Sequence, residues 1–307
     1  MSMKKGLGDV MNLILSLIPL FVVALGSDLS SLLIFTKDIS PADATWTLST
    51  PACQWKHIEC ANEVVVSIFL TDFGFYGVPN FTSLPSHLEQ LHLSNAMKKK
   101  MREDQSVGPR WGKTVGAHGF SGNPNFSNLP PSLEILDLSG NQFSGSLPVI
   151  GFNAKNSSGN LRQLFLHYNM FSGSAELFLQ QLPITMEVST FFGNDLSGNI
   201  EYIFSTLAAP NLTQLDLAWN NFTGFIELAS LSRCCPILSV LNLYGNHFEG
   251  PLNLQHLPAS LHFLALEDNA GICGSGSIVP QTVCGAVYLG KPCVVDCNSS
   301  SYWCPDC

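Results

Sequence analysis

The sequence predicts an α/β-type repeat solenoid, in which short strands from successive coils of the chain stack into a parallel sheet. The prediction rests on a unit that is clearest at residues 133–148, LEILDLSGNQFSGSLP. Its first half alternates like a strand and places Leu136 and Leu138 on one face. Its second half is typical of a turn that begins at Asn141. One such unit cannot bury its own apolar face, so copies must stack on both sides of it.

Copies of this unit are present along most of the chain. Eight units align on the position of Asn141, and from there the anchors advance by 28, 25, 26, 26 and 23 residues. The eight anchors are Phe73, Ala96, Asn141, Asn169, Asn194, Asn220, Asn246 and Asn269. Several units continue with an F-x-G pattern, as in Phe143 to Gly145. The Asn194 unit is the poorest match, because Ser189 occupies a core leucine position.

The unit resembles LxxLxLxxNxFxGxIP, the repeat of the plant-type extracellular leucine-rich-repeat family, and the resemblance covers residues 65–273. The chain is also similar to leucine-rich-repeat surface antigens of protists. The resemblance implies a horseshoe with a parallel β-sheet on its concave face and irregular or 3-10 segments on its convex side. We therefore expect residues 65–272 to form one curved sheet of eight short parallel strands.

Residues 1–26 are typical of a secretory signal. Lys4 and Lys5 precede an apolar run at residues 10–25, and Ala24 and Gly26 are small residues that suit signal peptidase. A membrane-spanning helix needs about 20 apolar residues, so the shorter run favours a cleaved signal over a retained anchor. The sequence indicates no later spanning segment. We therefore expect the mature chain to be secreted or at the cell surface.

Residues 27–64 precede the first repeat and have the character of a terminal cap. An apolar helical face recurs at Leu29, Leu32 and Leu33. Asp28 is placed to cap this helix. The order of helix, Trp46, Cys53 and Cys60 resembles the N-terminal cap of the plant-type family, and the resemblance implies that the two cysteines pair. Metal ligation by the two is the alternative, but no second ligand pair lies nearby in the sequence.

An insertion at residues 97–119 interrupts the repeat. The anchors Phe73 and Ala96 are 23 residues apart, whereas Ala96 and Asn141 are 45 apart, so removing 22 residues restores the period. The segment is basic, with a balance of +4. Three interpretations stay open: a functional loop, a tolerated disordered loop, or a stretch that does not belong in the mature message. We expect it to be dispensable for folding.

The charge of the chain argues against nucleic acid as a partner. The formal net charge is −9. Because the insertion carries +4 and the signal carries +1, the remaining residues carry −14. Such a surface repels phosphate backbones.

Cysteines and glycosylation motifs indicate an oxidising, extracellular setting. Six cysteines crowd residues 273–307, predicted to be a cysteine-rich C-terminal cap or the start of a cysteine-rich module: Cys273, Cys284, Cys293, Cys297, Cys304 and Cys307. Disulfides are favoured there over zinc ligation, and the connectivity stays open. At least one of Cys234 and Cys235 is expected to be a small buried apolar residue. Six N-glycosylation sequons are present, at Asn80, Asn125, Asn156, Asn211, Asn221 and Asn298.

A candidate binding surface follows from the residues that flank the core leucines, which should point outward from the concave face. The candidates for ligand binding are Phe165, His167, Phe192, Trp219, Tyr244, Asp216 and Asn242. Aromatic residues on an exposed surface are enriched at recognition sites. An alternative stays open, in which Phe165 and Phe192 pack locally to compensate for the poor repeat around Ser189.

These features predict a recognition protein that binds a protein or glycan through its concave face. Known motifs of hydrolases, metalloproteases and nucleotide-binding enzymes are missing from the sequence, so we expect neither an enzyme nor a cofactor or metal. The family resemblance offers another function, because plant members include inhibitors of cell-wall pectin-degrading enzymes such as polygalacturonase. A structural glycoprotein of the cell surface or matrix is the third candidate. The sequence indicates neither the ligand nor the oligomeric state.

Overall fold

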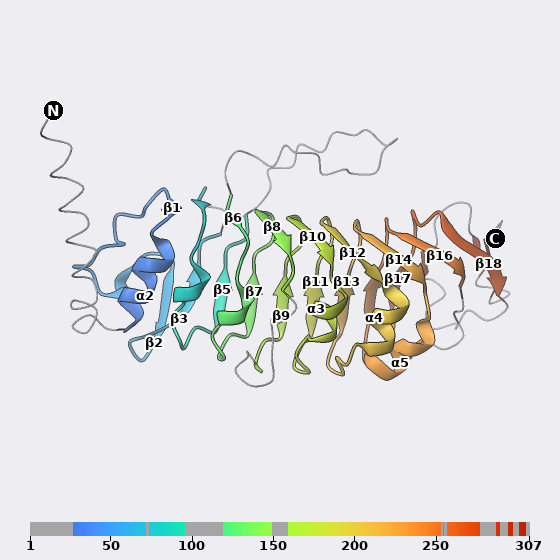
Figure 1. Cartoon of the computed structure of the whole chain (residues 1–307). Coiled ribbons are helices and arrows are strands. Elements are labelled where there is room, and N and C mark those ends of the chain that lie inside the picture. Colours follow the sequence, from blue (N-terminus) through green and yellow to red (C-terminus); the bar gives the residue numbers. More distant parts are fainter. Residues whose placement is uncertain are drawn as a thin grey trace, which may run out of the picture.

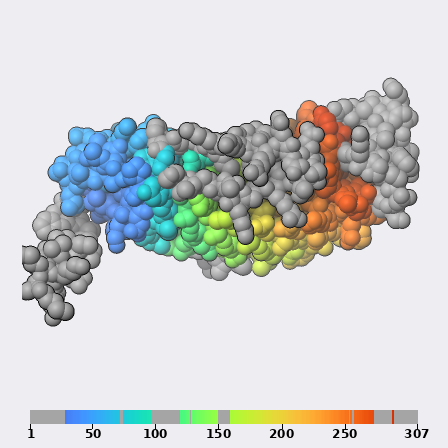
Figure 2. All heavy atoms as spheres, turned by 90° about the horizontal axis from the view of Figure 1, so that it is seen from above, coloured from blue at the N-terminus to red at the C-terminus, as the bar shows by residue number. Residues whose placement is uncertain are grey.

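The computed structural model describes residues 27–71, 74–95, 119–148, 159–252, 254, 257–276, 287–288, 294–296 and 301–304. These residues form coils that stack side by side in chain order, from helix α2 (Ser27–Thr36) at one end to strand β18 (Gly271–Gly276) near the other (Figure 1). Seen from above, the colours of the described residues follow the same order along one long axis (Figure 2). The predicted repeat solenoid is confirmed.

The L-x-L segments of the repeats form a ten-stranded sheet, here called the first sheet. Its strands are β2 Ile58–Ala61, β3 Val64–Phe69, β5 Gln90–His92, β7 Ile135–Asp137, β9 Gln163–Phe165, β11 Val188–Thr190, β13 Gln214–Asp216, β15 Val240–Asn242, β17 Phe263–Ala265 and β19 Val287–Tyr288. Strands β3 to β17 are the eight predicted repeat strands and pair in parallel, whereas β2 is antiparallel to β3. Leu136 pairs with Leu164 and Leu215 with Leu241, so equivalent leucines lie side by side in neighbouring coils.

The F-x-G segments form a second sheet, which the sequence analysis did not predict. Its nine strands are β6 Ser121–Gly122, β8 Gln142–Ser146, β10 Met170–Ser174, β12 Asp195–Asn199, β14 Asn221–Phe225, β16 His247–Pro251, β18, β20 Val294–Asp296 and β21 Ser301–Cys304. Strands β6 to β18 pair in parallel, and β21 and β20 add antiparallel pairs at the C-terminal edge. The expected turn is instead a strand that contains a glycine with positive φ, as at Gly145 (94°) and Gly173 (82°). The expectation of a single sheet was therefore wrong.

Short helices connect the second sheet back to the first. Besides α2, the described helices are α3 Glu176–Gln180, α4 Ile200–Thr206 and α5 Leu231–Cys234, with 3-10 turns at η1 Ala52–Gln54, η2 Phe81–Ser83, η3 Phe126–Asn128 and η4 Leu228–Ser230. The side chain of Asn199 caps α4 by accepting a hydrogen bond from the backbone N–H of Tyr202. The 3-10 turns agree with the predicted convex side, and the central coils add α-helical turns to it.

The hydrophobic core is one cluster that runs through all the coils. Its largest regular feature is a column of buried phenylalanines from the F-x-G segments: Phe120, Phe143, Phe171, Phe222 and Phe248. The rings of Phe143 and Phe171 are nearly parallel, 6.5 Å apart between centroids and inclined by 13°. Leu196 occupies this place in the Asn194 coil, where it is fully buried. Phe120 stacks on Phe143 in the same way as Phe171 does, so these three rings connect three neighbouring coils.

A ladder of buried asparagines, here called the asparagine ladder, satisfies the backbone where each coil turns out of the first sheet. Asn141 Nδ2 donates to the carbonyls of Leu93 (2.7 Å) and Leu138 (3.1 Å), and its Oδ1 accepts from the backbone N–H of Phe120 (2.9 Å). Equivalent bonds are made by Asn169, Asn194, Asn220, Asn246 and Asn269. Each asparagine side chain therefore hydrogen-bonds the backbone both in its own coil and in the preceding coil.

The poorest repeat contains a polar residue in the core. Ser189 is fully buried in β11, and no partner of its hydroxyl is found among the described residues. On the helical side of the same coil, Phe178 of α3 packs edge-on against Phe191, with ring centroids 6.0 Å apart. Large aromatic side chains therefore supply apolar bulk in the coil that lacks a core leucine.

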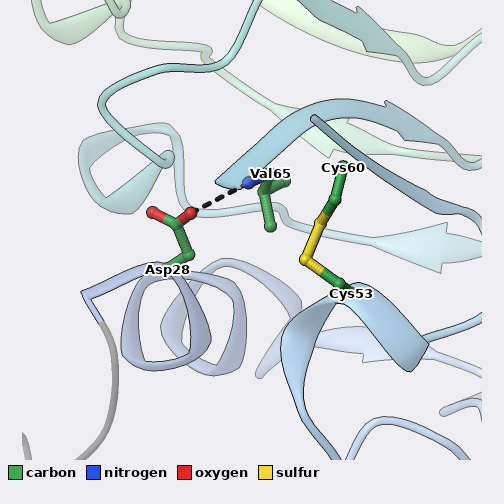
Figure 3. Close-up of a disulfide and its surroundings, with 4 residues drawn as sticks. All are labelled: Asp28, Cys53, Cys60 and Val65. Atoms are coloured by element: carbon green, nitrogen blue, oxygen red, sulfur yellow. Dashed lines mark hydrogen bonds between the residues drawn. A yellow bond between two sulfur atoms is a disulfide. The ribbon is translucent and has the colours of Figure 1, made fainter. Parts of the chain in front are cut away.

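The N-terminal cap closes the first coil. Cys53 and Cys60 form a disulfide, as the family resemblance implied (Figure 3). Trp46 stacks on Trp55 and on Phe75, with centroid distances of 6.2 and 5.3 Å. These rings cover the end of the core, which an exposed first coil would leave open to water.

Asp28 has a different role from the predicted one. Helix α2 begins at Ser27, so Asp28 lies inside its first turn and is not the cap. Its carboxylate accepts a hydrogen bond from the backbone N–H of Val65 at 2.9 Å, which joins α2 to strand β3 (Figure 3). The predicted apolar face of the helix is confirmed, since Leu29 and Leu32 are buried.

The insertion leaves and re-enters the solenoid at adjacent points. A Cβ placed on Gly119 would lie 3.5 Å from the side chains of both Asn95 and Asn141. The carbonyl of Gly119 accepts a hydrogen bond from the N–H of Gly77 at 3.4 Å, so Gly119 belongs to the coil. The segment to remove in a test is therefore residues 97–118, which lie outside the described residues.

We expect deletion of residues 97–118 to leave the melting temperature unchanged or higher, because the deletion joins two points that already lie close together. Thermal unfolding followed by circular dichroism measures the change. A control deletion of half that length within a repeat, which breaks the period, should abolish folding. A fall of several degrees in the melting temperature of the 97–118 variant would show that the segment packs on the solenoid.

Other predictions fall partly outside the described residues. Cys234 and Cys235 are both buried, as expected. Asn80, Asn125, Asn211 and Asn221 are exposed, so the structure leaves these sequons accessible. The signal, the pairing of the six C-terminal cysteines, Asn156 and Asn298 lie outside the residues whose side chains are described. None of the helices in the described ranges has the length and apolar character needed to span a membrane.

Candidate functional site

The candidate site lies on the face of the first sheet that points away from the core, here called the outer face. In-register pairing arranges its side chains in rows across the coils. One row contains His92, Asp137, Phe165, Thr190, Asp216 and Asn242. Residues two positions further along contribute His167, Phe192 and Tyr244. All seven predicted ligand-binding residues are half-buried, so each keeps part of its surface available.

Four side chains from the coils of β9 and β11 form a first aromatic cluster. The ring of His167 stacks on that of Phe192, with centroids 4.4 Å apart and planes inclined by 8°. Phe165 lies edge-on to His167 at 6.3 Å, and Tyr168 lies edge-on to Phe192 at 4.6 Å. His167 Nδ1 is 2.7 Å from the Thr190 hydroxyl. Burial lowers the pKa of His167, so the imidazole is neutral at pH 7 and acts as a flat, largely apolar surface.

A second aromatic cluster comes from the next two coils. The rings of Trp219 and Tyr244 meet at a steep angle of 68° with centroids 4.7 Å apart. The hydroxyl of Tyr244 donates to Asp268 Oδ2 at 2.6 Å, which fixes the orientation of the ring. Burial raises the pKa of Tyr244, and the hydrogen bond to Asp268 adds to the shift, so the phenol keeps its proton at physiological pH.

Two aromatics sit on backbone that usually belongs to glycine. The residue before each ladder asparagine has positive φ: Gly140 (71°), Tyr168 (54°), Gly193 (69°), Trp219 (51°), Gly245 (64°) and Asp268 (54°). Bulky side chains are rare in this left-handed region and cost free energy there. A Cβ on Gly245 would lie 2.8 Å from Trp219 Cε3, so this glycine makes room for the indole. The chain therefore places Tyr168 and Trp219 at this edge of the sheet despite a local cost.

Two aspartates of the same row differ in their surroundings. Asp137 Oδ1 accepts hydrogen bonds from the backbone N–H (3.0 Å) and the hydroxyl (2.6 Å) of Ser139, and His92 Nδ1 lies 3.9 Å from its Oδ2. Burial would raise the pKa of Asp137, but the hydrogen bonds of His92 and Ser139 outweigh it and lower the pKa.

Among the described residues, Asp216 has no hydroxyl or histidine partner that would offset the effect of burial on its pKa. It accepts one bond from the backbone N–H of Ala218 and one from Asn242 Nδ2, both at 3.0 Å. Ala218 stands where Ser139 supplies a hydroxyl to Asp137. Burial raises the pKa of Asp216 to about 6. The carboxylate is therefore ionised at pH 7 but poorly stabilised by the protein itself.

The structure brings the predicted residues together in pairs and adds others. His167 contacts both Phe165 and Phe192, Trp219 contacts Tyr244, and Asp216 contacts Asn242. Tyr168, Thr190 and Asp268 were not predicted. Tyr168 could have been found, because it occupies the same place in its repeat as Trp219. The two clusters lie on neighbouring coils, where the N–H of Gly193 donates to the carbonyl of Ala218 at 3.0 Å.

Phe165 and Phe192 do not fill the gap left by Ser189. Ser189 points into the core, whereas Thr190 beside it and Phe165 paired with Thr190 point to the outer face. In the part of the chain that the structure describes, His, Cys, Asp and Glu form no group of three that could hold a metal ion. Aromatic surface and carboxylates are therefore the chemistry of this site.

Comparisons with known proteins agree with this architecture. Two family models of the leucine-rich repeat match the chain, over residues 132–153 and 208–224. No curated protein matches significantly. One similar structure is the leucine-rich-repeat ectodomain of the receptor kinase GASSHO1/SCHENGEN3 from Arabidopsis thaliana in complex with CASPARIAN STRIP INTEGRITY FACTOR 2. The TM-score is 0.57 at 21% identity, covering 83% of this chain and 31% of that one.

A second similar structure is the Arabidopsis ectodomain of HAESA in complex with an N-terminally extended IDA peptide hormone. The TM-score is 0.52 at 22% identity, covering 85% of this chain and 43% of that one. This chain thus spans less than half the length of either ectodomain. The chain thus has a leucine-rich-repeat fold, and the two family-model matches lie within its repeats. Its fold is similar to that of these two plant ectodomains, as the sequence resemblance implied.

Proposed function

We propose that this protein is an extracellular recognition protein that binds a peptide or protein ligand on the outer face of the first sheet. The observation that carries the proposal is the group of six half-buried aromatic side chains in four successive coils, which are Phe165, His167, Tyr168, Phe192, Trp219 and Tyr244. A contiguous aromatic surface of this kind is typical of interface hot spots. Two of these side chains are held on costly backbone, which favours a functional role over a merely structural one.

The solved relatives support a peptide or protein over a glycan as the ligand. The GASSHO1/SCHENGEN3 ectodomain was solved with CASPARIAN STRIP INTEGRITY FACTOR 2, and the HAESA ectodomain with a peptide hormone. An extracellular location is supported by the signal predicted at residues 1–26, the Cys53–Cys60 disulfide and the four exposed sequons. The ligand itself can be sought by pull-down with the mature protein from culture medium.

We expect Trp219→Ala and Tyr244→Ala to weaken binding of the captured ligand at least tenfold, since truncation of an aromatic hot spot costs about 2 kcal/mol or more. Titration of the purified variants by isothermal calorimetry measures the effect. Trp219→Gly is the sharper variant, because glycine stands at the equivalent places Gly140, Gly193 and Gly245 and removes the side chain without adding backbone strain.

Secretion and melting temperature serve as controls for folding in this experiment. Tyr202→Ala is a matched control, since it removes an exposed aromatic side chain from helix α4, away from the outer face. Unchanged affinity in all three outer-face variants would contradict the proposal. Hydrogen exchange gives an independent check, because a bound ligand should protect the first sheet, whereas a structural coat glycoprotein without a ligand should show no such protection.

A further inference from the structure

We infer that the outer face recognises an arginine side chain of its ligand, whose guanidinium group pairs with Asp216 and lies against the rings of Tyr168 and Trp219. The inference rests on the proposed function and specifies the chemistry of the ligand, a basic peptide segment. Three independent observations carry it: the charge of the outer face, the unfilled bonding capacity of Asp216 and the placement of the two rings.

The strand segments that build the outer face are strongly acidic. The eight aligned segments contain eight acidic residues, which are Asp72, Glu89, Glu134, Asp137, Glu187, Asp216, Glu267 and Asp268. At the positions that face outward, the acidic residues are Asp137, Asp216 and Glu267. The same segments contain one basic residue, Arg162, and its Nε donates to Glu187 Oε1 at 2.9 Å. Electrostatic complementarity selects partners of opposite charge and repels others. A basic segment therefore fits this surface, and an acidic one does not.

Asp216 is the carboxylate with room for a further partner. An ionised carboxylate offers about four acceptor positions, and the described bonds from Ala218 and Asn242 use one at each oxygen. Both oxygens can therefore accept again, which suits the two parallel N–H groups of a guanidinium. Asp137, in the same row, is already served by Ser139 and His92. The difference singles out Asp216 among the two aspartates of this row.

Tyr168 and Trp219 occupy the same place in their repeats, directly before a ladder asparagine and close to the end of the strand. Trp219 follows Asp216 by three residues in the same coil. Burial raises the pKa of Tyr168, and the negative charge of Asp216 adds to the shift, which places that phenol within electrostatic range of the carboxylate. A guanidinium is planar and weakly hydrated, so it can stack on aromatic faces while it pairs with a carboxylate. The aromatic clusters and the acidic surface thus act on one ligand group.

The test uses short random peptides displayed on phage and selected on the whole purified protein. We expect arginine to be enriched among peptides selected on the wild type and not among those selected on Asp216→Asn. One selected peptide is then synthesised with arginine and with citrulline, its neutral analogue of nearly the same shape. The wild type should bind the arginine peptide at least about tenfold more tightly than the citrulline peptide.

Two variants distinguish the loss of the Asp216 charge from a general disturbance of the fold. Asp216→Asn should lose most of the preference for arginine over citrulline, whereas the matched Asp137→Asn should keep it, because Asp137 is already paired. Melting temperatures of both variants establish that they fold. Equal binding of the two peptides by the wild type, or an unchanged preference in Asp216→Asn, would overturn the inference.

Failure of the inference can be told apart from failure of the proposed function. If selected peptides bind and Trp219→Gly abolishes binding, but arginine gives no advantage, the outer face is a binding site and only the arginine pairing is wrong. If the selected peptides bind equally well to Trp219→Gly, Tyr244→Ala and the wild type, the outer face is not the site, and both proposals fail.

The pH dependence gives a further readout. Below pH 6 the carboxylate of Asp216 becomes protonated, so the preference for arginine should decline as the pH is lowered through about 6. His167, on a neighbouring coil, is a second titratable group, whose pKa burial lowers, while Tyr168 and Tyr244 stay protonated. The pH profile of the preference in Asp216→Asn is subtracted from that of the wild type, which removes the contribution of His167. A preference that is independent of pH in the wild type would contradict the pairing.

Discussion

Replacement of Asn141 by alanine is expected to lower the free energy of unfolding by about 4 kcal/mol, since each buried backbone group left without a partner costs roughly 1–3 kcal/mol. Asn141 is fully buried, and its side chain serves the carbonyls of Leu93, Leu138 and Ser139 and the N–H of Phe120. Alanine leaves the Leu93 carbonyl and the Phe120 N–H without a described partner, whereas the carbonyls of Leu138 and Ser139 keep hydrogen bonds from the Asn169 side chain and the backbone N–H of Asn95. Urea unfolding measures the change.

Ser146→Ala is the matched control for this experiment. Ser146 lies in the same coil and is exposed at the end of β8, so its loss should change the stability by less than about 0.5 kcal/mol. An Asn141→Ala variant that is as stable as the control would mean that the asparagine ladder contributes nothing to the stability of the solenoid.

The second large effect is expected in the phenylalanine column. Phe171 is fully buried and stacks on Phe143 of the preceding coil. We expect Phe171→Ala to lower the free energy of unfolding by about 3–5 kcal/mol, because it removes a large apolar side chain and leaves a cavity between neighbouring coils. The same urea titration reports the loss.

Phe171→Leu is the variant to compare with Phe171→Ala, because the chain already has a leucine at this position in another coil. Leu196 takes the place of phenylalanine in the next coil and is completely buried there. Leucine at position 171 should therefore cost clearly less than alanine, about 1–2 kcal/mol. Equal losses for the two variants would mean that the column tolerates no change in shape, and that the leucine coil is held together by other contacts.

Much of the fold could be predicted from the sequence because the first sheet obeys a simple period. Paired leucines such as Leu136 and Leu138 mark each strand, and the recurring asparagine marks its end, so the eight parallel strands appear where the units align. The second sheet could not be predicted in the same way. Its strands contain glycines such as Gly145 and Gly224 in left-handed conformation, and they are stabilised by pairing with the next coil more than by local preference.

The candidate site was predictable as a surface but not in its chemistry. The alternation of the strands was enough to place Phe165, Phe192 and Tyr244 on one face. The local sequence distinguishes Asp137 from Asp216 only by the residue two positions on, Ser139 or Ala218. The rest of the difference depends on residues in other coils, His92 for the first and Asn242 for the second. The predicted cap role of Asp28 failed for a similar reason, since its partner Val65 lies 37 residues away.

The asparagine ladder also has a consequence for the order in which the coils fold. The backbone N–H of Phe143 donates to the side chain of Asn169, and that of Phe171 donates to the side chain of Asn194. Each of these N–H groups therefore depends on an asparagine of the next coil. As the chain is synthesised from its N-terminus, a newly formed coil keeps a buried N–H without a partner until the next asparagine emerges. We therefore expect the ordered region to trail synthesis by one coil, with the last coil formed still lacking these hydrogen bonds.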